Sequence, residues 1–174
     1  MSRSPQPDFS KVRALILDSD GVLTDGGVYI TASGEQSRRF DIKDGLGLVR
    51  LREHGFHLAI ISASPIPVVE HRARQLGIND VYVDEKRKLE RAQELVEKWG
   101  LSIEAVAYIG DDLADLQMLA AVGLPIAVSD ATDSAIEAAA YVTKKPGGFG
   151  AVREVCDLIL QAHGHTASFN PSAI

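Results

Sequence analysis

Several carboxylates stand directly after short apolar segments of the chain. Asp18 and Asp20 follow VRALIL (12–17), while Asp111, Asp112 and Asp115 follow AVAYIG (105–110). Carboxylates that lie close together repel one another and raise each other's pKa unless a cation lies among them. Mg²⁺ is a hard ion that prefers oxygen ligands. We therefore expect a magnesium site wherever the fold brings these two acidic segments together.

A hydroxyl and an ammonium group complete a set that suits phosphoryl transfer. Ser62 ends the apolar segment 57–62, and Lys88 opens a helical pattern. Phosphoryl transfer needs an in-line attacking oxygen and positive charge beside the equatorial oxygens, and aspartate is an accepted nucleophile. We expect Asp18 to attack phosphorus and Asp20 to act as general acid and then as base for water. Ser62 and Lys88 are expected to hold the phosphoryl oxygens.

Each of these residues taken alone also has a purely structural explanation. Asp20 and Gly21 form a dipeptide that is common in tight turns, Ser62 can cap a helix, and Lys88 can be a solvated lysine. Only the combination at the ends of several apolar segments favours a reactive site.

The apolar segments that carry these residues predict a parallel sheet. Short runs with little polar alternation are typical of strands covered on both faces, and here they span 12–17, 57–62, 81–83, 105–110, 124–128 and 141–143. Helical patterns end at Gly77, Gly100, Gly123 and Gly164. Strands that alternate with helices predict a doubly wound α/β domain, in which ligands bind beyond the carboxyl ends of the strands.

One stretch interrupts this alternation. Residues 26–43 contain two polar-apolar runs around a turn at Ser33 and Gly34, which predicts a β-hairpin that projects from the domain. The segments between Asp20 and Asp44 and between Ser62 and Lys88 are too short for a cap domain.

Size and charge restrict the possible partners. The 174 residues suit a single domain, predicted over 10–164, with disordered ends at 1–9 and 165–174. The net charge of −6 argues against nucleic acids and anionic membranes as partners. No apolar run is long enough to span a bilayer, and the start lacks the pattern of a secretory signal, so we expect a cytoplasmic protein.

Four ordered motifs resemble those of the haloacid dehalogenase superfamily of phosphatases: LILDSDGVLTDG, Ser62, Lys88 and YIGDDLAD. The resemblance implies that Asp18 is the nucleophile and a ligand of Mg²⁺. It implies that Asp20 is the acid/base, whose backbone carbonyl also binds the metal. It further implies that Asp111 is a metal ligand and that Ser62 and Lys88 bind phosphate. Asp112 and Asp115 match supporting acidic positions.

Further segments resemble the 3-deoxy-D-manno-octulosonate 8-phosphate phosphatases and their nonulosonate-phosphate relatives: DSDGVLTDGG, FDIKDGLG, KLERAQEL and YVTKKPGGFGAVREVCDLIL. A small sugar-acid phosphate is therefore the expected substrate. The chain departs from that pattern where Ala63 and Ser64 replace Gly-Arg and where Phe149 replaces arginine in a Gly-Gly-Arg-Gly loop. Ser64, Arg72, Gly148 and Phe149 are candidate substrate contacts, and the glycine loop is a candidate anion cradle or a linker.

Capless members of this family close their sites by forming tetramers, so the resemblance implies a homotetramer. Three alternatives stay open at this stage: a phosphatase of another small metabolite, a sugar-phosphate-binding module without catalysis, and a receiver-like signalling module. In receiver domains the acidic pair follows the first strand, and the phosphorylated aspartate follows a later strand. Here the order differs, because the candidate nucleophile Asp18 comes first, with Asp20, and the acidic segment GDDLAD comes late.

Overall fold

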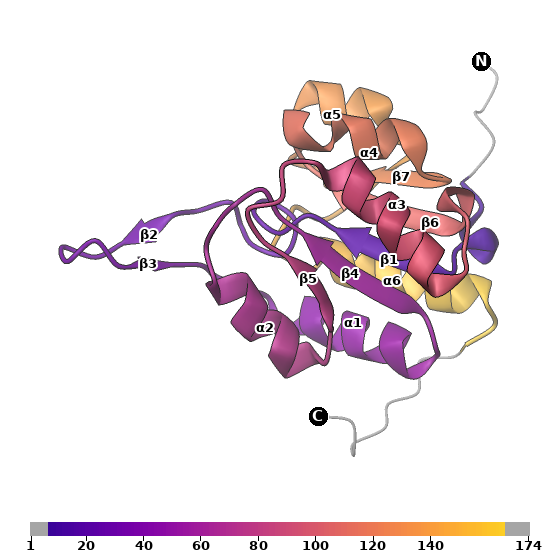
Figure 1. Cartoon of the computed structure of the whole chain (residues 1–174), viewed down its shortest axis with the longest axis horizontal. Helices are drawn as coiled ribbons and strands as arrows, with labels where there is room; N and C mark the ends of the chain where they lie inside the picture. The colour runs from indigo at the N-terminus through magenta and orange to yellow at the C-terminus, as the bar shows by residue number, and fades with distance from the viewer. Residues whose placement is uncertain (1–6, 166–174) are drawn as a thin grey trace.

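The computed structural model describes residues 7–165, which form a six-stranded parallel sheet and a separate hairpin. The sheet strands are β1 (Ala14–Leu17), β4 (His57–Ile61), β5 (Asp80–Tyr82), β6 (Val106–Gly110), β7 (Leu124–Ala127) and β8 (Tyr141–Val142). Their order across the sheet is β5-β4-β1-β6-β7-β8, and every neighbouring pair is parallel. The chain thus builds outward from β1 in one direction and then returns to its other side (Figure 1).

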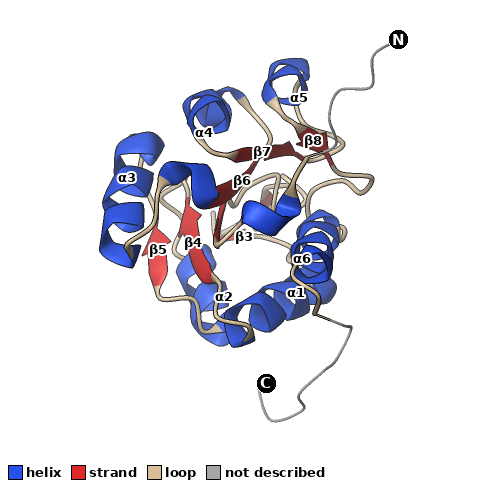
Figure 2. Ribbon diagram, turned by 90° about the vertical axis from the view of Figure 1, so that its right-hand side faces the viewer, coloured by secondary structure: helices blue, strands red, loops and turns tan. Residues whose placement is uncertain are grey.

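Helices cover both faces of this sheet, which confirms the predicted doubly wound α/β class (Figure 2). One face carries α1 (Ile42–Glu53), α2 (Val68–Leu76) and α6 (Ala151–Ala162). The other carries α3 (Lys88–Trp99), α4 (Leu116–Ala121) and α5 (Asp133–Ala138). Short 3-10 helices occupy Phe9–Lys11 (η1), Ile103–Ala105 (η2) and Leu113–Asp115 (η3).

The two-residue period of β1 divides the core between these layers. Leu15 and Leu17 pack with α1, α2 and α6, whereas Ala14 and Ile16 pack with α3, α4 and α5. All four side chains are fully buried. A strand with apolar residues on both faces is the expected central strand of a doubly covered sheet, and it places the end of β1 in the middle of the molecule.

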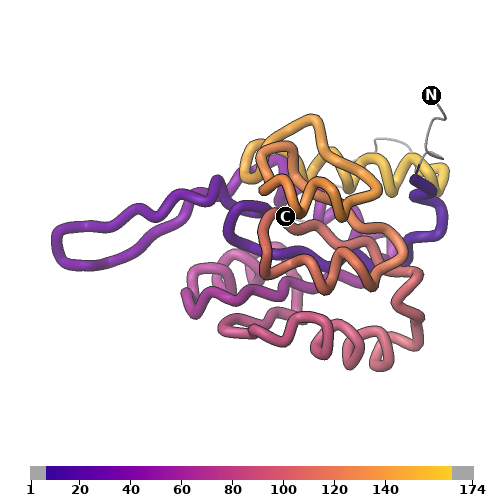
Figure 3. The backbone as a smooth tube through the Cα atoms, turned by 90° about the horizontal axis from the view of Figure 1, so that it is seen from above, coloured from indigo at the N-terminus to yellow at the C-terminus, as the bar shows by residue number. Residues whose placement is uncertain are grey.

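The predicted hairpin is present and extends well beyond the body of the domain (Figure 3). Its strands β2 (Tyr29–Ile30) and β3 (Gln36–Ser37) are short and antiparallel, and an isolated bridge between Thr24 and Phe40 closes its base. Val28, Tyr29 and Ile30 expose about half or more of their surface.

The hairpin ends earlier than the sequence suggests, because a helix begins at Ile42. The side chain of Asp41 caps this helix by accepting a hydrogen bond from the Lys43 amide. Gly45 and Gly47 lie within it, and glycine weakens the helical signal. Packing favours Gly47, since a Cβ there would meet Arg153 and Cys156 of α6 at about 3 Å. Close packing of α1 on α6 therefore explains a helix that the apolar pattern did not indicate.

The domain also extends one or two residues past its predicted ends. Phe9, predicted to be disordered, lies in η1 and packs edge-on against Tyr141. His165 contacts the ring of His54, while residues 1–6 and 166–174 of the predicted ends lie outside the described part. None of the described helices combines the length and apolar character that crossing a lipid bilayer requires.

Candidate active site

The acidic residues meet where the direction of sheet building reverses. β1 pairs with β6, so Asp18 and Asp111, which follow these two strands, come from adjacent strand ends. This position is the usual ligand site of an open α/β sheet. A cavity of about 340 Å³ lies there, and its lining consists of Asp18, Asp20, Gly21, Gly26, Ser62, Ala63, Ser64, Lys88, Asp111, Asp112, Ala114 and Asp115.

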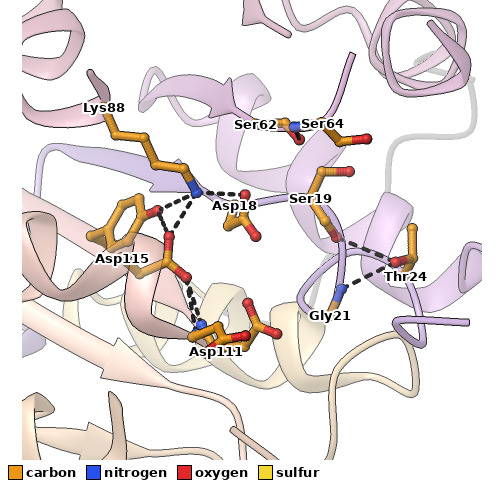
Figure 4. Close-up of polar contacts among 11 residues, drawn as sticks. Asp18, Ser19, Gly21, Thr24, Ser62, Ser64, Lys88, Asp111 and Asp115 are labelled. Carbon is orange, nitrogen blue, oxygen red and sulfur yellow. Dashed lines mark hydrogen bonds and ion pairs between the residues drawn. The ribbon is translucent and has the colours of Figure 1, made fainter. Parts of the chain in front are cut away.

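Lys88 joins the acidic residues from the third crossover. It is the first residue of α3, and its ammonium group is 2.7 Å from Oδ1 of Asp18 and 2.7 Å from Oδ1 of Asp115 (Figure 4). Only 3% of its surface is exposed. One buried cation thus serves two carboxylates, and Oδ2 of Asp18 has no hydrogen-bond donor within the described residues.

Asp115 uses both of its oxygens within the protein. Oδ1 accepts from Lys88 and from the Tyr108 hydroxyl at 2.5 Å, and Oδ2 accepts from the amides of Asp111 and Asp112 at 2.8 and 3.2 Å. Asp112 in turn caps η3 by accepting from the Leu113 amide. Through these bonds Asp115 holds the backbone of the loop after β6 in place.

The pKa shifts follow from one cation among several acids. Burial is the main cause that raises the pKa of Asp18 to about 6, with Lys88 opposing and Asp115 adding to it. Burial, followed by the charges of Asp18 and Asp115, raises the pKa of Asp111 to about 8. Burial disfavours the ammonium of Lys88, but the two neighbouring carboxylates outweigh it and raise its pKa. The site is therefore short of positive charge.

The loop after β1 is shaped so that the Asp111 side chain can approach its backbone closely. Gly21 has φ of +85°, and a Cβ on it would lie 2.0 Å from Oδ2 of Asp111. The buried hydroxyl of Thr24 accepts from the amides of Gly21 and Gly26 at 3.2 and 3.3 Å and holds the turn together. Only glycine can occupy position 21 without moving the Asp111 carboxylate.

These features fit a divalent cation. Carboxylate oxygens of Asp18, Asp111 and Asp115 lie within 4.8 Å of one another. Because Asp115 is fully hydrogen-bonded, Asp18 and Asp111 are the carboxylates with free oxygens, and both have the raised pKa that a cation would relieve. Mg²⁺ suits such an all-oxygen site.

Asp20 also reaches the cavity, and it has a partner that the sequence did not suggest. Its Oδ1 accepts from Nε of Arg38 at 3.0 Å, and the arginine side chain is only 4% exposed. Arg38 lies just after β3, so its contact depends on the path of the hairpin. Tyr108 and Thr24 were likewise not anticipated, because a tyrosine within a buried strand and a threonine in a turn carry no distinctive pattern.

Ser62 and Ser64 lie beside Asp18 on the opposite side from Asp111 (Figure 4). The hydroxyl of Ser62 accepts from the Ser64 amide at 3.2 Å, which fixes the turn after β4. Both serines, predicted as a phosphate contact and a candidate substrate contact, line the cavity.

The other candidate contacts do not line this cavity. Arg72 faces an apolar groove between α1 and α2, Gly148 packs against the backbone of Thr24 and Asp25, and Phe149 lies under the guanidinium of Arg39 at 4.2 Å.

The prediction that the glycine loop can cradle an anion is wrong, because its amides are already used. The amide of Gly147 donates to Asp130, that of Gly148 to Val22, and that of Phe149 to Pro146. The amide of Gly150 donates to the buried carboxylate of Asp44, which also accepts from Arg153.

Comparison with known proteins gives consistent matches. The family model for haloacid dehalogenase-like hydrolases matches residues 59–154. The 3-deoxy-D-manno-octulosonate 8-phosphate phosphatase KdsC of Escherichia coli strain K12 is 44% identical over 153 residues, covering 88% of this chain and 81% of the relative.

Solved structures resemble the chain over a similar length. The 3-deoxy-D-manno-octulosonate 8-phosphate phosphatase of Yersinia pestis is 43% identical with a TM-score of 0.88, covering 90% of this chain and 85% of that one. The enzyme of that name from Moraxella catarrhalis, solved with a magnesium ion, a phosphate ion and KDO, is 37% identical with a TM-score of 0.86 and covers 89% of each chain.

Proposed function

The chain belongs to the haloacid dehalogenase-like hydrolases, and from that premise we propose that it is a Mg²⁺-dependent phosphatase of a small sugar-acid phosphate. The proposed substrate is 3-deoxy-D-manno-octulosonate 8-phosphate, because the similar proteins are named as phosphatases of this compound. A nonulosonate 9-phosphate is the second candidate. The observation that carries the proposal is the Asp18 carboxylate, with one oxygen held by Lys88 and the other free, beside Asp111 in an open cavity.

The reaction follows from this arrangement in two steps. In the first, the free oxygen of Asp18 forms a bond to phosphorus as the ester P–O bond breaks, and the leaving alkoxide takes a proton from the carboxyl of Asp20. In the second, water loses a proton to Asp20 and attacks the phosphorus of the aspartyl-phosphate, which releases inorganic phosphate and restores Asp18. Ser62 and Lys88 hold the phosphoryl oxygens throughout.

The metal belongs to the same proposal. Asp18, Asp111 and the backbone carbonyl of Asp20 would hold Mg²⁺. When bound, it balances the charge of the carboxylates and of the transferring phosphoryl group. The raised pKa of Asp111 supports this assignment, since an uncompensated carboxylate at that position is unfavourable.

Substrate choice is proposed to depend on residues at the cavity mouth. Ser64 lies in the cavity and replaces the arginine that octulosonate phosphatases have after Gly at this point. A serine can donate one hydrogen bond to a sugar carboxylate, whereas arginine can pair with it through two. Because this replacement weakens the expected contact with an octulosonate carboxylate, nonulosonate phosphates should be tested as substrates alongside 3-deoxy-D-manno-octulosonate 8-phosphate.

A homotetramer in the cytoplasm completes the proposal. The exposed apolar residues of the hairpin, Val28, Tyr29 and Ile30, together with Ile42, which is 82% exposed, favour a surface that another copy covers. In such an assembly Arg72 and Phe149 would contribute to a neighbouring site. A tetramer by analytical ultracentrifugation, converted to smaller species by Ile30→Asp, supports this arrangement, while a monomeric parent contradicts it.

Phosphate release tests the proposed activity. With Mg²⁺ the parent should hydrolyse 3-deoxy-D-manno-octulosonate 8-phosphate in preference to a panel of other phosphorylated sugars and nonulosonates. Asp18→Asn should abolish turnover without unfolding the protein, and chelation should stop it reversibly. Preference for an unrelated phosphate would replace the substrate class, and no hydrolysis of any ester would favour a binding or receiver-like module.

A further inference from the structure

An ion pair between Asp20 and Arg38 links the loop after β1 to the hairpin. Arg38 comes from the returning arm of the hairpin, 18 residues after Asp20, and its side chain is 4% exposed. Burying a guanidinium is unfavourable unless its donors are satisfied. Here Nε donates to Oδ1 of Asp20 at 3.0 Å, and Nη1 donates to the Ser37 carbonyl at 3.2 Å.

The geometry places Arg38 behind Asp20 and outside the reaction space. Asp20 lines the cavity, whereas Arg38 does not. The guanidinium fixes Oδ1, and Oδ2 of Asp20 has no donor or acceptor within the described residues. One oxygen is therefore anchored while the other stays available to a ligand in the cavity.

Several contacts hold the base of the hairpin in place, and with it the backbone that carries Arg38. The bridge between Thr24 and Phe40 closes it, and Nη1 of Arg39 donates to the Gly148 carbonyl at 2.5 Å. Tyr29 donates to Asp25 at 2.6 Å across the outgoing arm. Arg38 therefore extends from a fixed frame rather than from a free loop.

From these contacts we propose that Arg38 is a positioning residue, which orients the carboxyl group of Asp20 for proton transfer to the leaving oxygen. The inference rests on the proposed function, in which Asp20 is the general acid. A carboxyl that rotates freely about its side-chain bonds spends little time at the leaving oxygen, and misplacement by about 1 Å can lower a rate by about 10²-fold. The hairpin thus serves the chemistry directly as well as offering an apolar surface.

Two substrates that differ in their need for an acid separate this role from a structural one. The alkoxide of 3-deoxy-D-manno-octulosonate must be protonated as it leaves, whereas p-nitrophenolate leaves without help. The value of kcat/KM reports the steps through formation of the aspartyl-phosphate. Arg38→Met should lower kcat/KM about 10- to 100-fold for the sugar phosphate but by less than about 3-fold for p-nitrophenyl phosphate.

Two further variants control this comparison. Arg38→Lys keeps a cation at the position and should recover most of the sugar-phosphate activity. Arg13→Met removes an exposed arginine before the opposite end of β1, whose Nη1 contacts Ser10, Val12 and His163, and should leave both values unchanged. Thermal denaturation and sedimentation of each variant show whether fold and assembly are retained.

The outcomes distinguish the two proposals. An equal loss for both substrates would overturn the positioning role, because it indicates a contact with the phosphoryl group or a general loss of structure. An Arg38→Met variant with unchanged kinetics, or an Arg38→Lys variant no better than Arg38→Met, would also overturn it. A parent that hydrolyses neither ester would instead refute the proposed function, and this inference with it.

Discussion

Replacement of Lys88 by methionine should be costly, because it removes the ammonium group that contacts two buried carboxylates. Methionine keeps the length and apolar character of the stem but not the charge. Asp18 and Asp115 each lie 2.7 Å from the ammonium group, and the lysine is 3% exposed. Since its neighbours raise the pKa of Lys88, the ammonium is charged at neutral pH, and the variant loses a full positive charge.

The size of the destabilisation follows from the two buried carboxylates that remain without a cation in the variant. Removing one partner of a buried ion pair typically costs about 3–5 kcal/mol. For a domain of this size that corresponds to a fall in melting temperature of about 6–20 °C. Protonation of Asp18, whose pKa is already raised to about 6, limits the loss, so the destabilisation should be smaller at pH 5 than at pH 8.

Denaturant unfolding in the presence of a chelator measures this cost. The matched control is Lys86→Met, which removes an exposed lysine two residues earlier and should change the unfolding free energy by less than about 0.5 kcal/mol. Adding Asp18→Asn to Lys88→Met should restore part of the stability by removing one unpaired charge. A loss below about 1 kcal/mol for Lys88→Met, or a double variant no more stable than the single one, would refute the reasoning.

Three further predictions concern the loop, the acidic cluster and the last helix. Gly21→Ala should lower activity by more than about 10²-fold, measured by phosphate release, because its Cβ would lie 2.0 Å from the Asp111 carboxylate. The pKa of Asp111 is raised to about 8, so its contribution to stability is present below about pH 4 and is lost as pH rises through 8. Thermal melts in chelator should therefore show stability falling from about pH 4 to about pH 8, less so in Asp111→Asn, and Mg²⁺ should reverse the fall in the parent alone. Asp44→Ala should cost about 1–3 kcal/mol in denaturant unfolding, because the amides of Gly150 and Arg153 lose a buried acceptor.

The sequence alone was sufficient to predict the sheet and the meeting of its two acidic segments. Apolar runs that end in polar residues identify β1, β4 and β6, and the carboxyl ends of parallel strands converge wherever such strands are neighbours. The meeting of Asp18 and Asp111 therefore followed from local patterns combined with one topological rule.

Helix α1 and the glycine loop could not be read in this way. In α1, Gly45 and Gly47 obscure the helical pattern. A Cβ on Gly47 would meet α6, which begins more than a hundred residues later, and a Cβ on Gly45 would meet Arg72 and Leu76 of α2. In the glycine loop, Gly147 and Gly150 suggested free amides, yet Asp130 and Asp44 already accept from them. A sequence shows which donors exist but does not show which distant acceptors occupy them.

The partners of the reactive groups were decided only by tertiary structure. Residue types and order determined that Asp18, Asp20 and Lys88 would gather at one edge of the sheet. Only the positions of the side chains, within a few ångströms, determine that Lys88 contacts both Asp18 and Asp115. The same holds for the contact of Arg38 with Asp20. The strands themselves follow from short-range apolar patterns along the chain, whereas such contacts depend on the packing of segments that are far apart in the sequence.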